Sequence, residues 1–311
     1  MSLMNTTPLN TEEKFWSVLA HLSAFTGGVG LLIPIYGWIE NRQKSAYACF
    51  QSLQALFYQS VGYTLWAVLY LVVLIGLSIF TLPGLLQNLT TGTAEIGPWL
   101  TTHALVIFGL YGLYLLVPLV GALLCALGRE FHYPLLGRPI ARFLHYLPGE
   151  QPEALDETHA DRFAASMGHF CVIYPLWGLF VPVAVLVTQG GRSRYLKFQA
   201  LQTIVFQVAT ALVTLILGII TFVVLLSALL PFALAKNPAE PPIESLLGAM
   251  LFLVCLGVLI LVVPLFQILG QWAGLRVLQG HDYRYPLVGR LVENWLAKRE
   301  AAAPLQKEKS V

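Results

Sequence analysis

Long apolar runs alternate with short polar segments along the chain. Four of these runs are long enough to cross about 30 Å of hydrocarbon as helices, at 1.5 Å of rise per residue. They cover residues 53–82, 99–127, 201–235 and 246–278, and polar loops follow at 87–98 and 236–244. The pattern therefore predicts two membrane-spanning helices in each half of the chain.

Two further apolar segments are broken near their centres. Residues 15–39 and 163–187 are interrupted by glycine and proline, including Gly30, Pro34, Gly178 and Pro182. About 25 residues are too few for two full spans, since each span needs about 20. Each broken segment is thus either a shallow re-entrant hairpin or a single kinked crossing, and we favour the hairpin.

The chain is a tandem duplication. SAYACFQSLQALFYQ (45–59) matches SRYLKFQALQTIVFQ (193–207) at a fixed offset of 148, and GREFHYPLLGR (128–138) matches GHDYRYPLVGR (280–290). We predict an all-α integral membrane protein of two fused repeats, each with one broken segment, two long transmembrane helices and one interfacial amphipathic helix. The expected domains are repeat 1 (1–147), a polar acidic linker (148–162), repeat 2 (163–297) and a basic tail (298–311).

Composition supports a membrane protein and excludes several other classes. Hydrophobic residues make up 57% and charged residues 11% of the chain, against about 25% charged residues in soluble domains. The four cysteines lie singly, so no disulfide framework or zinc site is predicted. The chain shows no nucleophile–base pair, phosphate loop or intramembrane carboxylate, so we expect no enzymatic activity and no nucleic-acid partner.

The distribution of basic residues predicts the topology. With a hairpin in each repeat, 17 of the 18 Lys and Arg residues fall on one side, and only Lys236 falls on the other. Basic residues concentrate on the cytoplasmic side of membrane proteins. We therefore expect a multi-pass protein of the bacterial inner membrane with both termini in the cytoplasm.

A short amphipathic segment follows the YPL string of each repeat. Its basic face includes Arg138 and Arg142 in repeat 1 and Arg290 in repeat 2. Such a segment suits a helix lying at the surface of an anionic leaflet, although packing against the protein's own loops is the alternative. Tyr133 and Tyr285 would then contact lipid and anchor these helices.

Polar residues recur at equivalent positions inside the apolar segments. His21 and His169 either ligate haem or pigment or, as we prefer, hydrogen-bond to carbonyls freed at the Gly/Pro breaks; no other cofactor is expected. Amides at the start of the central helices either line a polar vestibule or join helices by hydrogen bonds. These are Gln51, Gln54, Gln199 and Gln202, and Gln267 and Gln271 add a pair in repeat 2 only.

The linker carries Asp156, Glu157, His159 and Asp161, which are metal-ligand types. We expect a solvated linker with no metal, because no rigid element fixes the geometry of these side chains.

The motifs LAHLSAF (19–25), LIPIYGWI (32–39), FQSLQALFYQ (50–59) and HYPLLGR (132–138), with their second copies, resemble the Tic-twenty-like family and its bacterial relatives of unknown function. This resemblance covers most of the chain and implies a helical bundle contributing to a protein-conducting channel. Gln51 and Gln199 stand where that family often has histidine. Three functions follow as alternatives: a structural or assembly subunit of a membrane complex, which we favour, a channel or translocation component, and a haem- or pigment-binding protein.

Overall fold

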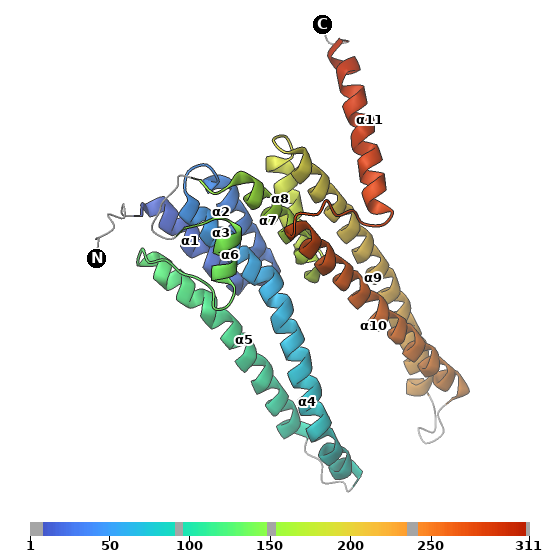
Figure 1. Ribbon diagram of the computed structural model, residues 1–311. Coiled ribbons are helices and arrows are strands. Elements are labelled where there is room, and N and C mark those ends of the chain that lie inside the picture. Colours follow the sequence, from blue (N-terminus) through green and yellow to red (C-terminus); the bar gives the residue numbers. More distant parts are fainter. Residues whose placement is uncertain (1–8, 91–95, 148–153, 235–241, 309–311) are drawn as a thin grey trace. The chain divides into compact units, whose positions relative to one another are not determined.

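The protein, represented by a computed structural model, is mainly helical in the residues that the structure describes, which are 9–90, 96–147, 154–234 and 242–308 (Figure 1). The chain divides into two compact units, Met1–Met167 and Gly168–Val311. The predicted all-helical class and the duplicated architecture are confirmed.

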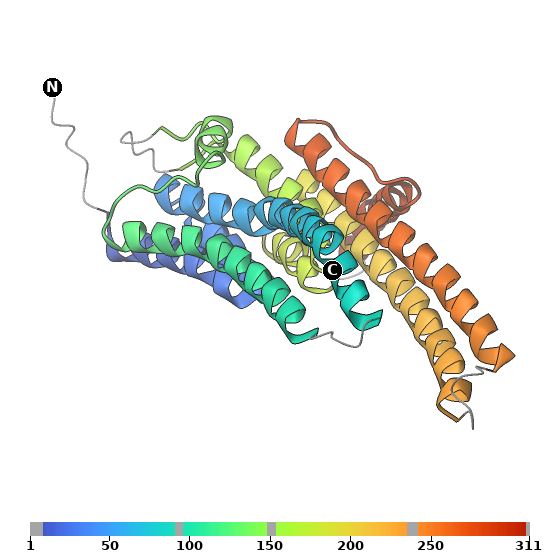
Figure 2. The same ribbon diagram turned by 90° about the horizontal axis from the view of Figure 1, so that it is seen from below.

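In unit 1, a cluster of short helices leads into a pair of long ones. The short helices are α1 (Thr11–Leu22), α2 (Leu32–Asn41) and α3 (Ala46–Phe57), and the long ones are α4 (Tyr63–Thr90) and α5 (Ile96–Ala126). Between α3 and α4, Tyr58–Gly62 forms a π-helical turn, η2. Figures 1 and 2 show α4 and α5 extending together away from the short helices. The short helix α6 (Gly137–Phe143) follows α5.

Unit 2 repeats this plan, with one continuous helix in place of α3, η2 and α4. Helix α7 (Glu157–Phe170) begins in unit 1 and ends in unit 2, and α8 (Phe180–Gln189) follows it. The long pair is α9 (Arg194–Leu234) and α10 (Ile243–Leu278), which lie side by side in both views (Figures 1 and 2). The last element is α11 (Val288–Glu308).

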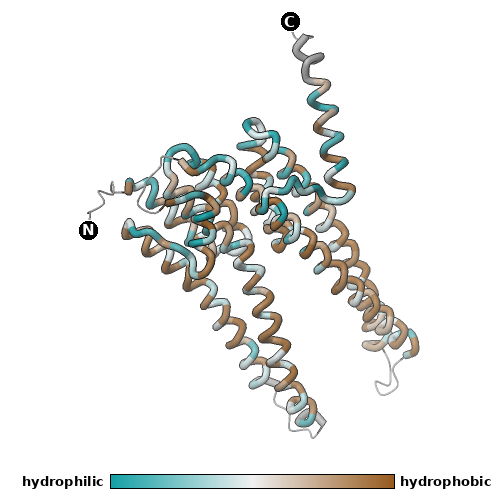
Figure 3. The backbone as a smooth tube through the Cα atoms, in the orientation of Figure 1, coloured by the Kyte–Doolittle hydropathy of each residue, from teal (hydrophilic) through white to brown (hydrophobic). Residues whose placement is uncertain are grey.

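The long helices are apolar over most of their surface. Figure 3 shows hydrophobic residues along α4, α5, α9 and α10, and large side chains such as Phe80, Phe108 and Leu261 are exposed. Five stretches are long and apolar enough to span a membrane: Thr11–Asn41, Ala46–Gln87, Gly97–Ala126, Arg194–Leu234 and Ile243–Leu278. Exposed apolar surface on this scale is stable only against lipid, so the chain is a multi-pass membrane protein.

The first broken segment turns back on itself. Gly27 breaks the helix with a φ of 62° and ψ of −142°. At the two ends of the segment, the Ser45 hydroxyl donates a 2.6 Å hydrogen bond to Oε1 of Glu13. Thr11–Asn41 therefore has the length of one span, but it starts and ends at the same place, as a hairpin does.

The second broken segment shares one close backbone contact with the first. A Cβ on Gly178 would lie 2.0 Å from the carbonyl oxygen of Cys171, and one on Gly30 would lie 2.0 Å from that of Ser23. Only glycine permits so close an approach of one backbone segment to another. The glycine at the break is thus the residue that allows each turn.

The domain boundaries remain predictions, but the structure adds detail near them. Helix α7 starts at Glu157, inside the predicted linker, and α11 continues to Glu308, inside the predicted tail. The linker residues 148–153 and Lys236, the one basic residue expected on the far side, lie outside the described residues.

The predicted interfacial helices correspond to α6 and to the first part of α11. In α6, Ile140 is buried and Arg138 and Arg142 are exposed. In α11, Val292 and Leu296 are buried, and Arg290 is exposed. Both helices therefore pack an apolar side on their own unit and leave arginines on the outer side.

Candidate functional site

Each unit encloses a cluster of hydrogen-bonded polar side chains around a buried histidine. In unit 1 it consists of His21, Gln51, Gln54 and Tyr133, which we call cluster 1. All four side chains are at most 2% exposed. They come from the end of α1, from α3 and from the loop after α5, so cluster 1 joins three parts of the unit that are distant in sequence.

The His21 ring is bonded at both nitrogens. Its Nδ1 lies 2.9 Å from the Tyr133 hydroxyl, and its Nε2 lies 3.0 Å from Oε1 of Gln51. Burial raises the pKa of Tyr133 well above its usual value, so this hydroxyl stays protonated and can donate. The ring is then a neutral imidazole that accepts at Nδ1 and donates from Nε2.

Two glutamines fix the loop after α5. The amide nitrogens of Gln51 and Gln54 donate to the Phe131 carbonyl at 3.1 and 2.7 Å. Gln54 also donates to Oε1 of Gln51 at 2.5 Å and accepts from the Tyr133 backbone N–H at 3.4 Å. These bonds assign the amide orientations, because Oε1 of Gln51 must face the donating His21.

Unit 2 contains the equivalent cluster 2, formed by His169, Gln199, Gln202 and Tyr285. Nδ1 of His169 lies 3.0 Å from the Tyr285 hydroxyl, and Nε2 lies 3.0 Å from Oε1 of Gln199. Gln202 donates to Gln199 at 2.5 Å and to the Tyr283 carbonyl at 2.8 Å. The duplication therefore preserved a whole set of contacts.

An aromatic ring covers the tyrosine of each cluster. Tyr133 stacks on Tyr58 with ring centroids 4.2 Å apart, and Tyr285 stacks on Phe206 at 3.9 Å. The partners occupy equivalent positions on the central helices. Stacking holds each tyrosine ring in place, so that its hydroxyl stays directed at the histidine.

The two clusters differ at one position on the central helix. Thr203 in unit 2 replaces Ala55 of unit 1. The Thr203 hydroxyl lies 3.0 Å from Nδ1 of His169 and also donates to the Gln199 carbonyl at 2.7 Å. Cluster 2 thus has a second hydroxyl within reach of the imidazole, and cluster 1 has none at the equivalent position.

The carbonyls near each break are bonded to other amides. Gln59 donates to the Ala20 carbonyl at 3.0 Å, and Gln207 donates to the Gly168 carbonyl at 2.9 Å. Our expectation that His21 and His169 bind such carbonyls is therefore wrong, because both histidines bond side chains instead. Haem ligation is equally unsuited to these rings, because both nitrogens of each ring are already bonded.

Tyr133 and Tyr285 correct a second expectation. We predicted that they contact lipid, but each is 2% exposed and bonded to a histidine. Tyrosine is a common residue at membrane interfaces, and the partner histidine lies more than a hundred residues away in the sequence. The recurrence of YPL in both repeats was the one sequence feature that pointed to a shared role.

The six glutamines singled out in the sequence fall into two groups. Gln51, Gln54, Gln199 and Gln202 are completely buried and join helices to loops. They act as inter-element hydrogen-bonding groups, and the alternative of a polar vestibule has no support from these contacts. Gln271 donates to the Phe170 carbonyl at 3.0 Å, so it belongs to the same kind of packing. Gln267 instead lines an apolar cavity of about 380 Å³ in unit 2.

Together, the fold and the two clusters define a class: a duplicated, all-helical, multi-pass membrane protein with one closed polar cluster in each copy. The chain belongs to the MamF/MmsF family, described as the magnetosome magnetite crystal formation protein family, whose sequence model matches residues 12–140 and again 160–292. The two matched regions correspond to the two repeats. No curated protein and no solved structure matches the chain.

The family match overturns the resemblance to Tic-twenty-like proteins. The matching family is a magnetosome family, so the Tic-twenty-like assignment is wrong, and the protein-conducting channel that it implied loses its basis. The strings that suggested it are short and mostly apolar. Such strings recur among helical membrane proteins because hydrocarbon selects the same few residue types.

Proposed function

We propose that the protein is a non-enzymatic structural or assembly component of the membrane that encloses a forming magnetite crystal. The description of its family supplies the setting, since it refers to the magnetosome and to magnetite crystal formation. The architecture supports the role, since helices long and apolar enough to cross a bilayer make up more than half of the chain.

The observation that carries this proposal is the closure of both clusters. His21 and His169 are the titratable side chains at the centre of the two repeated contact sets, and both ring nitrogens of each are bonded within the protein. A general acid or base needs a free position within reach of its substrate. Groups bonded in this way hold helices together, which supports a structural role.

The proposed orientation places both termini in the cytoplasm. The hydrogen bond between Ser45 and Glu13 supports this orientation, since a first segment that returns to its own side would have its basic flanking residues on one side. The exposed arginines Arg138, Arg142 and Arg290 would then meet the anionic cytoplasmic leaflet of the bacterial inner membrane or of a compartment derived from it. Other membrane protein subunits are the expected partners.

The proposal is tested in a magnetite-forming bacterium that produces the chain. The gene is deleted and then restored with an affinity-tagged copy, and an untagged strain serves as the control for purification. We expect altered crystal size or number in the deletion strain by electron microscopy. We also expect a stoichiometric set of membrane proteins to co-purify with the tagged chain in mild detergent. Unchanged crystals together with a chain that purifies alone would contradict the proposal.

A further inference from the structure

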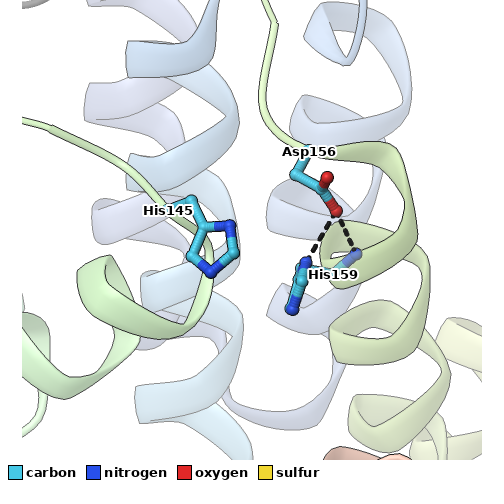
Figure 4. A group of neighbouring side chains, drawn as sticks. All are labelled: His145, Asp156 and His159. Atoms are coloured by element: carbon cyan, nitrogen blue, oxygen red, sulfur yellow. Dashed lines mark hydrogen bonds and ion pairs between the residues drawn. The ribbon is translucent and has the colours of Figure 1, made fainter.

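Two histidines and an aspartate lie close together where the segment after α6 approaches the start of α7. Figure 4 shows His145 from the segment after α6 facing Asp156 and His159 at the start of α7. One ligand atom from each of the three side chains lies within 4.8 Å of the others. The His145 and His159 rings have centroids 4.3 Å apart. In the part of the chain that the structure describes, this is the one such group of three.

The side of the group that carries His145 is fixed by the core of unit 1. Its neighbours Leu144 and Tyr146 are buried, and Tyr146 stacks on Phe50 with centroids 4.3 Å apart and planes inclined by 9°. His145 itself has a φ of 51°, a left-handed conformation that few side chains adopt. Glycine adopts this backbone conformation at lower steric cost, yet the chain has a histidine at this position.

The side that carries Asp156 and His159 is fixed as well. Oδ1 of Asp156 accepts from the backbone N–H of His159 at 2.8 Å and so caps the first turn of α7. Asp161, one turn further, pairs with Arg42 at 2.8 Å, and Leu155 is buried. Our expectation that no rigid element fixes these side chains is therefore wrong, since α7 begins at Glu157, although Asp156 and Glu157 are exposed to solvent.

The chemistry of the group suits a metal ion. The Asp156 carboxylate offers an anionic oxygen ligand, and it is held in place by hydrogen bonds from the backbone N–H and the ring of His159. Its Oδ1 lies 2.7 Å from Nδ1 of His159. In a tetrahedral site with bonds of about 2.0–2.1 Å, ligand atoms lie about 3.4 Å apart. Small side-chain rotations therefore suffice to bring all three ligands around one ion.

We infer that His145, Asp156 and His159 bind a divalent first-row transition-metal ion such as Zn²⁺ or Fe²⁺. Two imidazoles with one carboxylate favour these ions over Mg²⁺ and Ca²⁺, which prefer oxygen ligands. All three side chains reach solvent, so the ion exchanges with free metal, and water fills the remaining positions. The inference goes beyond the proposed function and does not depend on it.

The test uses the full chain in detergent, purified without a histidine tag, and titrated with Zn²⁺ by calorimetry and with Co²⁺ by visible absorption. Three variants each remove one ligand: His145→Gly, Asp156→Asn and His159→Ala. Glycine suits the positive φ at position 145, and asparagine keeps the helix cap, so these two variants should fold normally. His281→Ala, which removes an exposed histidine of unit 2, is the matched control.

We expect one ion per chain for the unmodified protein and for His281→Ala. Each ligand variant should bind more than about tenfold more weakly, with an unchanged melting temperature without metal for His145→Gly and Asp156→Asn. Anaerobic Fe²⁺ should compete with Zn²⁺. Absence of binding, or equal affinity in all variants, would overturn the site, and equally tight Mg²⁺ binding would overturn its assignment to transition metals.

Discussion

Gly30 lies so close to the carbonyl of Ser23 that a Cβ at position 30 would come within 2.0 Å of the oxygen. The same relationship joins Gly178 to Cys171 in the second unit. The obstacle is backbone, so no rotation of a side chain relieves it. The reversal of each broken segment thus requires glycine at this position, because any other residue would add a Cβ that collides with the backbone.

Gly30→Ala should therefore destabilise the protein by about 1–3 kcal/mol, the usual cost of overpacking. Thermal unfolding in detergent measures this effect. Gly76→Ala is the matched control, because a Cβ at Gly76 meets no atom within 4 Å, and alanine favours a helix more than glycine does. Equal stability of the two variants would contradict the proposed contact.

Loss of one hydroxyl should affect the two clusters unequally. Tyr133→Phe leaves Nδ1 of His21 without its donor and should cost about 1–2 kcal/mol. Tyr285→Phe should cost less, because the Thr203 hydroxyl lies 3.0 Å from Nδ1 of His169 and can turn away from the Gln199 carbonyl, which the backbone of α9 also bonds, to donate to the ring. Adding Thr203→Ala to Tyr285→Phe should raise the cost to that of Tyr133→Phe. Equal effects of the two single changes would show that Thr203 does not substitute.

Gln54→Met should release the loop after α5. Methionine has a similar shape but cannot donate to the Phe131 carbonyl or accept from the Tyr133 N–H. We expect faster hydrogen–deuterium exchange in a peptide covering residues 128–136, measured by mass spectrometry. The exposed Gln43→Met serves as the control, and unchanged exchange in Gln54→Met would show that the loop is held by other contacts.

The two ends of the first broken segment should be accessible from one side of the membrane. In a background without the four native cysteines, Glu12→Cys and Lys44→Cys place thiols at exposed positions flanking the segment. Both should react with a membrane-impermeant maleimide in inverted vesicles and neither in intact spheroplasts. Labelling of the two positions from opposite sides would establish a crossing instead of a hairpin.

The sequence predicted the features that depend on local pattern. Apolar length located α4, α5, α9 and α10, because a helix must cover the thickness of the hydrocarbon. Duplication marked His21 and Gln51 as important, because polar residues inside apolar segments recurred in both copies. Glycine and proline located the breaks, and the charge distribution favoured the hairpin that Glu13 and Ser45 close.

Features that depend on long-range contacts could not be predicted. Tyr133 lies in a loop next to a proline, and only the folded chain brings it 2.9 Å from His21. His145 and His159 lie in separate polar segments, and their approach depends on α6 and α7 packing on unit 1. The family was also beyond reach, because short apolar strings do not distinguish one helical membrane protein family from another.

The π-helical turn at Tyr58–Gly62 has a consequence for the symmetry of the protein. A π turn accommodates one more residue than an α turn, so every side chain beyond it is rotated by about 100° around the helix axis. Helix α9 has no such turn at the equivalent place. Residues that align without a gap in α4 and α9 therefore face the bilayer in different directions. The two copies therefore match in their buried clusters but not in the outward faces of α4 and α9. A neighbouring membrane protein would meet a different surface on each copy.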